Sequence, residues 1–148
     1  MQTPDQNTGQ TAPDMAKILG WGGVAPFILC GAAAQSGERV LVLYGLLGGT
    51  TYAAMILSFL GAVHWGLAMR DDRHHGWYIW SIAPALLGWA TLLVFDIQIR
   101  LLALIPLFTL AWAVDRMATK QGLMPDWYMQ LRTGLTVGAI VGLLLMAI

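Results

Sequence analysis

Residues 49–69 read GTTYAAMILSFLGAVHWGLAM and contain no Asp, Glu, Lys or Arg. A helix of about 20 apolar residues spans the roughly 30 Å hydrocarbon core of a bilayer, so this run predicts a transmembrane helix. The uncharged stretch between Arg39 and Arg70 contains 30 residues, or about 45 Å of helix at 1.5 Å per residue. Because this length exceeds the bilayer, we expect residues 40–48 to be a tilted, kinked or interfacial lead-in.

The composition supports a membrane environment for the whole chain. Of 148 residues, 57% are hydrophobic and 11% are charged, whereas about a quarter of the residues are charged in a typical soluble domain. The formal net charge is zero, so no global field would attract nucleic acid, and we expect no nucleic-acid partner. We therefore predict an all-α integral membrane protein.

Four further segments have the length and apolar character of a membrane span. With residues 49–69 they predict a single domain, residues 17–148, built as a bundle of five transmembrane helices. The preceding residues 1–16 are polar and lack an apolar period, so we expect a disordered tail. The four further helices are expected at residues 18–35, 77–95, 97–121 and 125–147.

The first of these segments has a second interpretation. Lys17, the apolar run and Ala32–Ala34 resemble a secretory signal peptide with its cleavage site. No basic residue precedes Lys17, however, and Pro26 and several glycines interrupt the apolar run. We therefore favour a retained helix.

The distribution of basic residues predicts the orientation. With the N-terminus in the cytoplasm and loops on alternating sides, six of the eight Lys and Arg residues lie inside and two lie outside, which is the usual bias. The prediction is a cytoplasmic N-terminus and a periplasmic C-terminus. The inside residues are Lys17, Arg70, Arg73, Arg116, Lys120 and Arg132, and the outside ones are Arg39 and Arg100.

Small residues recur at fourfold spacing on two of the expected helices. This spacing places them on one helix face and allows close approach of another backbone. The partner is either a helix of the same bundle or a helix of another protein or copy. The two rows are Gly134, Gly138 and Gly142, and Gly45, Gly49, Ala53 and Gly61.

The fourth and fifth helices should form a hairpin, with Gly122 ending the first and Pro125 starting the second. Asp115 lies seven residues before Gly122 and Arg132 lies seven after Pro125, so both should sit about 10 Å from the turn. We predict an ion pair between Asp115 and Arg132, with Arg116 as an alternative partner, because a charge that faces lipid is costly.

Two more polar residues should share this depth. His64 lies six residues before Arg70 and Ser81 lies five after Gly76, which allows a polar layer of His64, Ser81, Asp115 and Arg132. A neutral imidazole bonded to a neighbouring helix is the simplest interpretation of His64. The alternatives are a proton relay, a haem or metal ligand, or a contact to a lipid head group.

The sequence carries no complete catalytic or cofactor motif. Residues 45–51, GLLGGTT, lack the lysine of a phosphate-binding loop, and the GxSxG, HExxH and CxxCH patterns are absent. We therefore expect no enzyme, no bound cofactor and no metal site.

Several motifs together resemble a known family. Residues 52–66 (YAAMILSFLGAVHWG), 81–89 (SIAPALLGW), Asp115-Arg116 and 123–132 (LMPDWYMQLR) resemble the membrane family called domain of unknown function 3429, which includes the mitochondrial transmembrane protein 69. The resemblance covers roughly residues 18–148. It implies a multi-pass protein of the bacterial inner membrane or its mitochondrial equivalent, with about five helices and no established activity. The residues in the matching motifs are His64, Trp65, Asp115, Arg116, Trp127, Tyr128 and Arg132.

These observations support three hypotheses about function. The rows of small residues and the missing catalytic motifs favour an accessory or assembly protein that packs against helices of a larger membrane complex, such as a respiratory complex. The polar layer favours instead a small carrier or binding protein for a proton or a small molecule. A third hypothesis is a haem- or quinone-linked redox protein that uses His64.

Overall fold

A computed structural model describes residues 11–70 and 75–148, and all regular structure within these ranges is helical. The all-α prediction is thus confirmed. Arg73 and residues 1–10 of the expected tail lie outside the described ranges. The helices are α1 (Asp14–Ala34), α2 (Arg39–Arg70), α3 (Gly76–Leu92), α4 (Ile97–Lys120) and α5 (Asp126–Ala147).

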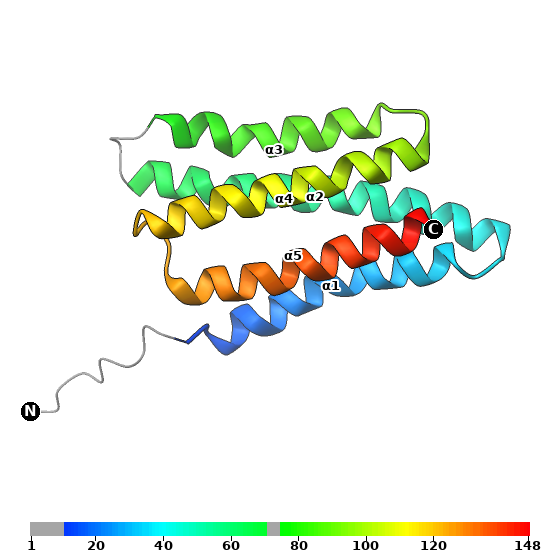
Figure 1. Cartoon of the computed structure of the whole chain (residues 1–148), viewed down its shortest axis with the longest axis horizontal. Helices are drawn as coiled ribbons and strands as arrows, with labels where there is room; N and C mark the ends of the chain where they lie inside the picture. The colour runs from blue at the N-terminus through cyan, green and yellow to red at the C-terminus, as the bar shows by residue number, and fades with distance from the viewer. Residues whose placement is uncertain (1–10, 71–74) are drawn as a thin grey trace, which may run out of the picture.

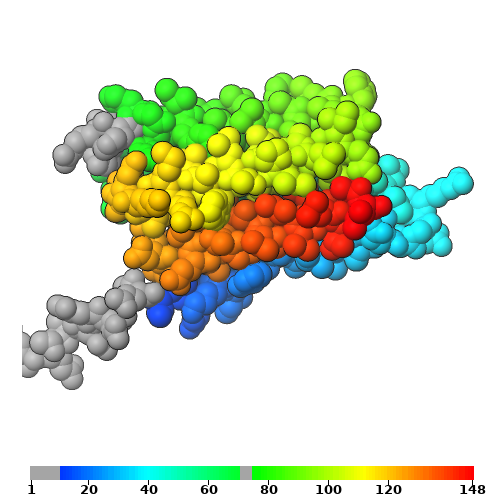
Figure 2. Space-filling model, viewed as in Figure 1, coloured from blue at the N-terminus to red at the C-terminus, as the bar shows by residue number. Residues whose placement is uncertain are grey.

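The five helices form an antiparallel bundle in which the chain runs up and down in sequence order (Figure 1). Each helix contacts the next around a closed ring, α1–α5–α4–α3–α2, and α2 also contacts α4 and α5 across the ring. On the face shown in Figure 2, α3, α4, α5 and α1 follow one another, with most of α2 behind them. Helix α2 is therefore the element that touches all the others.

Helix α2 corrects one expectation. Residues 40–48 are no separate lead-in, because α2 is continuous from Arg39 to Arg70 over 32 residues. Gly45 in this part is buried and packs against the backbone of α1, so tertiary contacts stabilise the extra turns. Those first turns extend past the ends of the neighbouring helices α3, α4 and α5 (Figure 1).

The start of the first helix also differs from the expected one. Helix α1 begins at Asp14, within the predicted tail, because the Pro13 carbonyl accepts from the Lys17 amide at 3.1 Å. An acidic residue in the first turn suits the helix dipole. The tail prediction is therefore wrong for residues 14–16.

Four of the five helices are long and apolar enough to cross a membrane. Helix α3 has 17 residues, slightly fewer than the roughly 20 that a span usually needs. It lies antiparallel to both α2 and α4 (Figure 1). The bundle of apolar helices is thus confirmed with four candidate spans, and the crossing by α3 stays a prediction.

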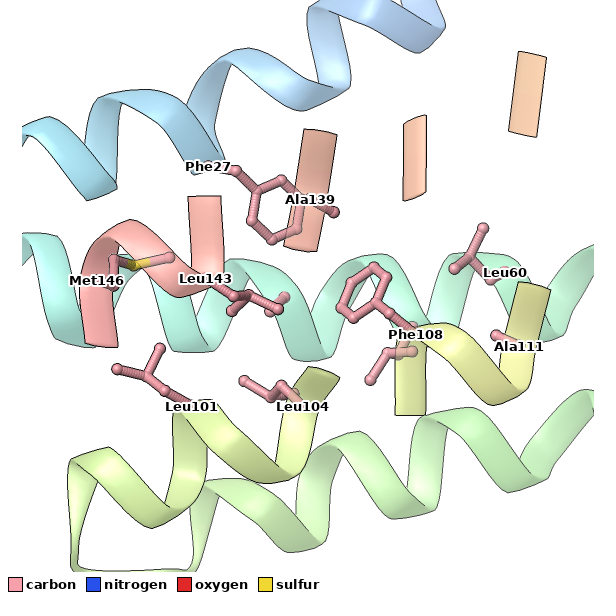
Figure 3. Packing of buried hydrophobic residues seen from close by; sticks show 11 residues of the cluster. Phe27, Leu60, Leu101, Leu104, Phe108, Ala111, Ala139, Leu143 and Met146 are labelled. Atoms are coloured by element: carbon pink, nitrogen blue, oxygen red, sulfur yellow. The ribbon is translucent and has the colours of Figure 1, made fainter. Parts of the chain in front are cut away.

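A hydrophobic core joins α1, α2, α4 and α5 near the middle of the bundle (Figure 3). Phe27 and Phe108 meet edge to face with ring centroids 5.7 Å apart, a favourable aromatic geometry. Leu57, Leu104 and Leu143 are fully buried beside them. These contacts set how the helices are rotated about their axes.

The predicted hairpin between α4 and α5 is confirmed. Gly122 has φ of +74°, a left-handed conformation that glycine adopts without strain. This turn lets the Leu123 amide donate to the Ala118 carbonyl at 3.1 Å, which satisfies the end of α4. Pro125 then occupies the position before α5, so α4 and α5 pack as antiparallel neighbours.

Candidate functional site

A buried polar cluster lies about two helical turns from one end of the bundle. Its members are His64 on α2, Asp115 on α4 and Arg132 on α5, with exposed fractions of 1%, 1% and 4%. Each lies five or six residues from the helix terminus at that end. All three residues are therefore separated from the same end of the bundle by nearly the same number of residues. Because the rise per residue of a helix is constant, they lie at one depth.

The ion pair predicted across the hairpin is confirmed. Arg132 Nε donates to Asp115 Oδ2 at 2.6 Å, a short distance typical of a charge-assisted hydrogen bond. Arg132 Nη1 donates to Thr136 Oγ1 at 2.6 Å. Tyr128 approaches Asp115 Oδ2 through its hydroxyl at 3.5 Å, the long limit for a hydrogen bond.

His64 completes the cluster from the opposite side of Asp115. Its Nε2 atom lies 3.3 Å from Asp115 Oδ1, while Nδ1 lies 3.4 Å from the Leu60 carbonyl oxygen of its own helix. The imidazole stacks on Trp77 with centroids 5.2 Å apart and meets the edge of Trp80 at 6.4 Å. The two indoles thus cover the imidazole on the α3 side.

Three buried polar atoms of the cluster have no hydrogen-bond partner within the described residues. They are His64 Nε2, Asp115 Oδ1 and Arg132 Nη2. The first two lie within ion-pair distance of each other, but their orientation does not make a hydrogen bond. Buried polar groups without partners are costly. The cluster therefore holds unused donor and acceptor capacity.

Two residues expected near the cluster do not join it. Ser81 is buried at the α2–α3 contact, and its hydroxyl donates to the Tyr78 carbonyl of its own helix at 2.6 Å. Arg116 is exposed and lies 5.3 Å from the Trp112 ring centroid. It is not the partner of Asp115, because adjacent positions on a helix point about 100° apart.

The structure adds residues that the sequence did not single out. Thr136 receives the second hydrogen bond of Arg132 and donates its own hydroxyl hydrogen to the Arg132 carbonyl at 2.8 Å. Its position four residues after Arg132, on the same helix face, is the signal that could have identified it. Trp80 lies three residues after Trp77, which is the corresponding signal for the second indole.

Both rows of small residues pack inside the bundle. A Cβ on Gly138 would lie 2.7 Å from Val24, and one on Gly142 would lie 2.6 Å from Phe27, so this face of α5 packs closely on α1. Gly134 faces Trp21. On α2, Gly45 packs on α1, Gly49 on Met146 and Gly61 on the Ser81 carbonyl, while Ala53 is fully buried. The interpretation as contacts within one bundle is confirmed.

The motif aromatics lie at the same end of the bundle as the polar cluster, in the last turns of α2 and the first turn of α5. Trp65 is 43% exposed and meets Tyr78 edge to face at 5.3 Å. Trp127 is half-buried and meets Tyr128 at 6.3 Å. This end is therefore rich in aromatic rings, which favour the interface between lipid and water.

Metal binding has little support from the side chains described. Within residues 11–70 and 75–148, no three His, Cys, Asp or Glu side chains gather as a metal site would require. His64 and Asp115 alone supply two such groups, whereas structural zinc needs about four ligands. The arrangement is better suited to binding protons or hydrogen-bonding ligands.

Comparisons with known proteins agree with the resemblance expected from the motifs. The profile of a family described as "Protein of unknown function (DUF3429)" matches residues 12–148. Transmembrane protein 69 of Xenopus tropicalis is 32% identical over 142 residues, which cover 89% of this chain and 53% of the relative. The chain thus spans about half the length of that relative. No solved structure matches this chain.

Proposed function

The chain belongs to the DUF3429 family of membrane proteins, and we propose that it is a small intramembrane binding or carrier protein whose buried cluster binds a proton. One observation carries the proposal: three buried polar atoms, on His64, Asp115 and Arg132, have no partner among residues 11–70 and 75–148 and gather within a single cluster. In an environment of low dielectric, such groups gain the most from a bound proton or ligand. The proposal contains no catalytic step.

The proton site is the contact between His64 and Asp115. Both ring nitrogens of His64 face oxygen atoms that can only accept: Nδ1 lies 3.4 Å from the Leu60 carbonyl oxygen and Nε2 lies 3.3 Å from Asp115 Oδ1. A neutral imidazole carries one N–H, so in either tautomer one lone pair faces an acceptor. A second proton gives the ring a donor on both sides and, with a small rotation of the ring, makes the contact with Asp115 a charge-assisted hydrogen bond. The Oδ2 atom keeps its bond to Arg132 throughout.

The test is a pH titration of the histidine ring nitrogens by ¹⁵N NMR, with the protein in lipid nanodiscs. His64→Gln assigns the His64 signals among the three histidines of the chain. We expect the His64 ring to change from one protonated nitrogen to two as the pH is lowered. In Asp115→Asn this change should shift or disappear. A His64 signal that stays constant throughout the titration would overturn the proton role.

The accessory-protein hypothesis has lost its main support. It rested on small-residue faces that were free to receive a partner helix, and both faces pack within the bundle. Partner helices or a second copy would have to use lipid-facing surfaces such as those of Phe59 and Ile79. Such surfaces are equally suited to lipid, so the binding-protein proposal is preferred.

We propose a bacterial inner-membrane location with a cytoplasmic N-terminus, supported by the six-to-two distribution of basic residues. The prediction is tested by cysteine labelling in a Cys30→Ala background, with Ser36→Cys and Gln121→Cys in turns at opposite ends of the bundle. A membrane-impermeant maleimide added to spheroplasts should label position 36 and spare position 121. The reverse pattern would invert the orientation.

A further inference from the structure

A cavity of about 240 Å³ lies next to the polar cluster, between α1, α2 and α5. Its walls are apolar except for Arg132, which is its only charged lining residue. The lining includes Gly23 and Phe27 of α1, Ile56 and Phe59 of α2, and Phe108 of α4. The cavity is therefore an apolar space that ends at the Arg132 side of the polar cluster.

The cavity reaches from the interior to the lipid-facing surface. Phe27 and Phe108 are almost completely buried, whereas Phe59 is 66% exposed. Gly23 and its neighbour Gly20 contribute no side chain, which leaves room beside α1. A molecule dissolved in the bilayer can thus approach along the α1–α2 side.

The charge of the cluster limits the chemistry of an occupant. While His64 is neutral, Asp115 compensates the charge of the Arg132 guanidinium, so an anionic ligand would then bring an uncompensated charge into a region of low dielectric. Arg132 Nη2 has N–H groups with no partner within the described residues. An uncharged acceptor oxygen would satisfy this donor without adding charge.

The volume and the apolar walls of the cavity limit the size and shape of the ligand that can bind in it. An apolar cavity of about 150 Å³ holds a benzene ring, so 240 Å³ has room for one six-membered ring and a few more carbons. The Phe27 and Phe108 rings provide aromatic surfaces against a flat head group. A longer tail would extend past Phe59 into lipid.

We propose that this cavity binds an uncharged, lipid-soluble quinone, with the ring among Phe27, Ile56 and Phe108 and one carbonyl oxygen accepting a hydrogen bond from Arg132 Nη2. The site rests on the proposed function, because the same cluster supplies the donor. Asp115 holds Arg132 by Nε, and Thr136 holds it by Nη1. Both contacts hold the guanidinium, and the buried Nη2 atom, which has no partner within the described residues, meets the ligand after a small rotation of the side chain.

The test measures equilibrium binding of radiolabelled 2-decyl-1,4-benzoquinone to the full chain in phosphatidylcholine nanodiscs. We expect saturable binding at one site. Ile56→Phe should weaken binding at least about tenfold, because the added ring atoms occupy the cavity. Met55→Phe is the matched control: it is the adjacent residue, is 65% exposed and does not line the cavity. It should leave binding unchanged.

Two competing ligands test which chemical groups of the quinone the cavity recognises. Decylbenzene has the ring and tail without the oxygens and should compete at least about tenfold less well, because the Arg132 donor then stays unsatisfied. Decanoate should also compete poorly. Equal binding of the labelled quinone by wild type and Ile56→Phe would refute the site. A signal that does not saturate, because the quinone only partitions into the lipid, would refute it as well. Stronger competition by decanoate than by unlabelled quinone would overturn the neutral ligand in favour of an anionic one.

The outcomes separate this site from the proton site. A His64 that titrates in a protein without saturable quinone binding would refute the quinone site and leave the proton proposal standing. Saturable quinone binding in a protein whose His64 does not titrate would refute the proton proposal and leave the quinone site standing.

Discussion

The interior of the bundle contains two adjoining regions, the hydrophobic core and the polar cluster, that are packed in opposite ways. In the hydrophobic core, side chains such as Phe108 and Leu143 are buried and have no polar group to satisfy. In the polar cluster, an ion pair and a histidine leave three buried atoms without partners in the described chain. Well-packed apolar residues often stabilise a protein as well as a buried ion pair does. The contrast indicates that stability alone does not account for the cluster.

The two regions also depend on different parts of the chain. The hydrophobic core draws on α1, α2, α4 and α5 but not on α3. In the cluster, α3 contributes Trp77 and Trp80, which cover His64. Helix α3 itself packs on α2 through Ser81 and Gly88, at sites where the backbones approach closely. This helix thus serves the cluster more than the hydrophobic core.

The largest effect should come from removing one partner of the buried ion pair. Asp115→Ala strands the Arg132 guanidinium and should lower the free energy of unfolding by roughly 3–5 kcal/mol. Joint replacement by Asp115→Leu and Arg132→Met should recover much of this loss, because no charge is left buried. The measurement is reversible unfolding in mixed detergent micelles. Equal losses in the single and double variants would mean that the pair does not act as a unit.

A smaller effect is expected where α5 packs against the hydrophobic core. In Gly142→Ala the new Cβ would lie 2.6 Å from Phe27 Cβ and 2.9 Å from its backbone carbon, so α1 and α5 must separate. We expect a loss of roughly 1–3 kcal/mol, the usual cost of overpacking. Gly22→Ala is the control, because nothing lies within 4 Å of its Cβ position. The same unfolding assay should show no loss for Gly22→Ala, and a similar loss in both variants would contradict the close contact.

The smallest effect is expected at the edge of the cluster. Tyr128→Phe removes a hydroxyl that lies 3.5 Å from Asp115 Oδ2, so it should cost less than about 1 kcal/mol. Thr136→Val is the comparison, since it removes the acceptor of a 2.6 Å bond from Arg132 and should cost about 1–3 kcal/mol. A larger loss in Tyr128→Phe than in Thr136→Val would reverse the order of these two contacts.

The positions of residues along the helices could be predicted from the sequence. Counting residues from the turn at Gly122 places Asp115 and Arg132 at one depth, and the 2.6 Å contact between them confirms it. Counting from Arg70 places His64 there too, and it lies 3.3 Å from Asp115. Such counts succeed because the helical rise per residue is nearly constant.

The direction in which each side chain points could not be predicted in the same way. Ser81 has a suitable depth, but its hydroxyl donates to the Tyr78 carbonyl of its own helix at 2.6 Å and does not join the cluster. The sequence left Arg116 open as a partner for Asp115, and the rotation of α4 places Arg116 at the surface. The spacing of Gly134, Gly138 and Gly142 identified a contact face without saying which helix would cover it.

The sequence by itself therefore determined an apolar helical protein, the hairpin at Gly122 and the depth of each polar residue, because these depend on local composition and on the regular rise of a helix. Only the tertiary structure decided which faces meet: α1 against the small-residue face of α5, Thr136 beside Arg132, and a cavity that ends at Arg132. The physical reason is that the rotation of a helix about its axis is set by packing against neighbours distant in sequence. In a bundle with apolar surfaces on every side, hydrophobicity alone does not distinguish the buried face from the lipid-facing one.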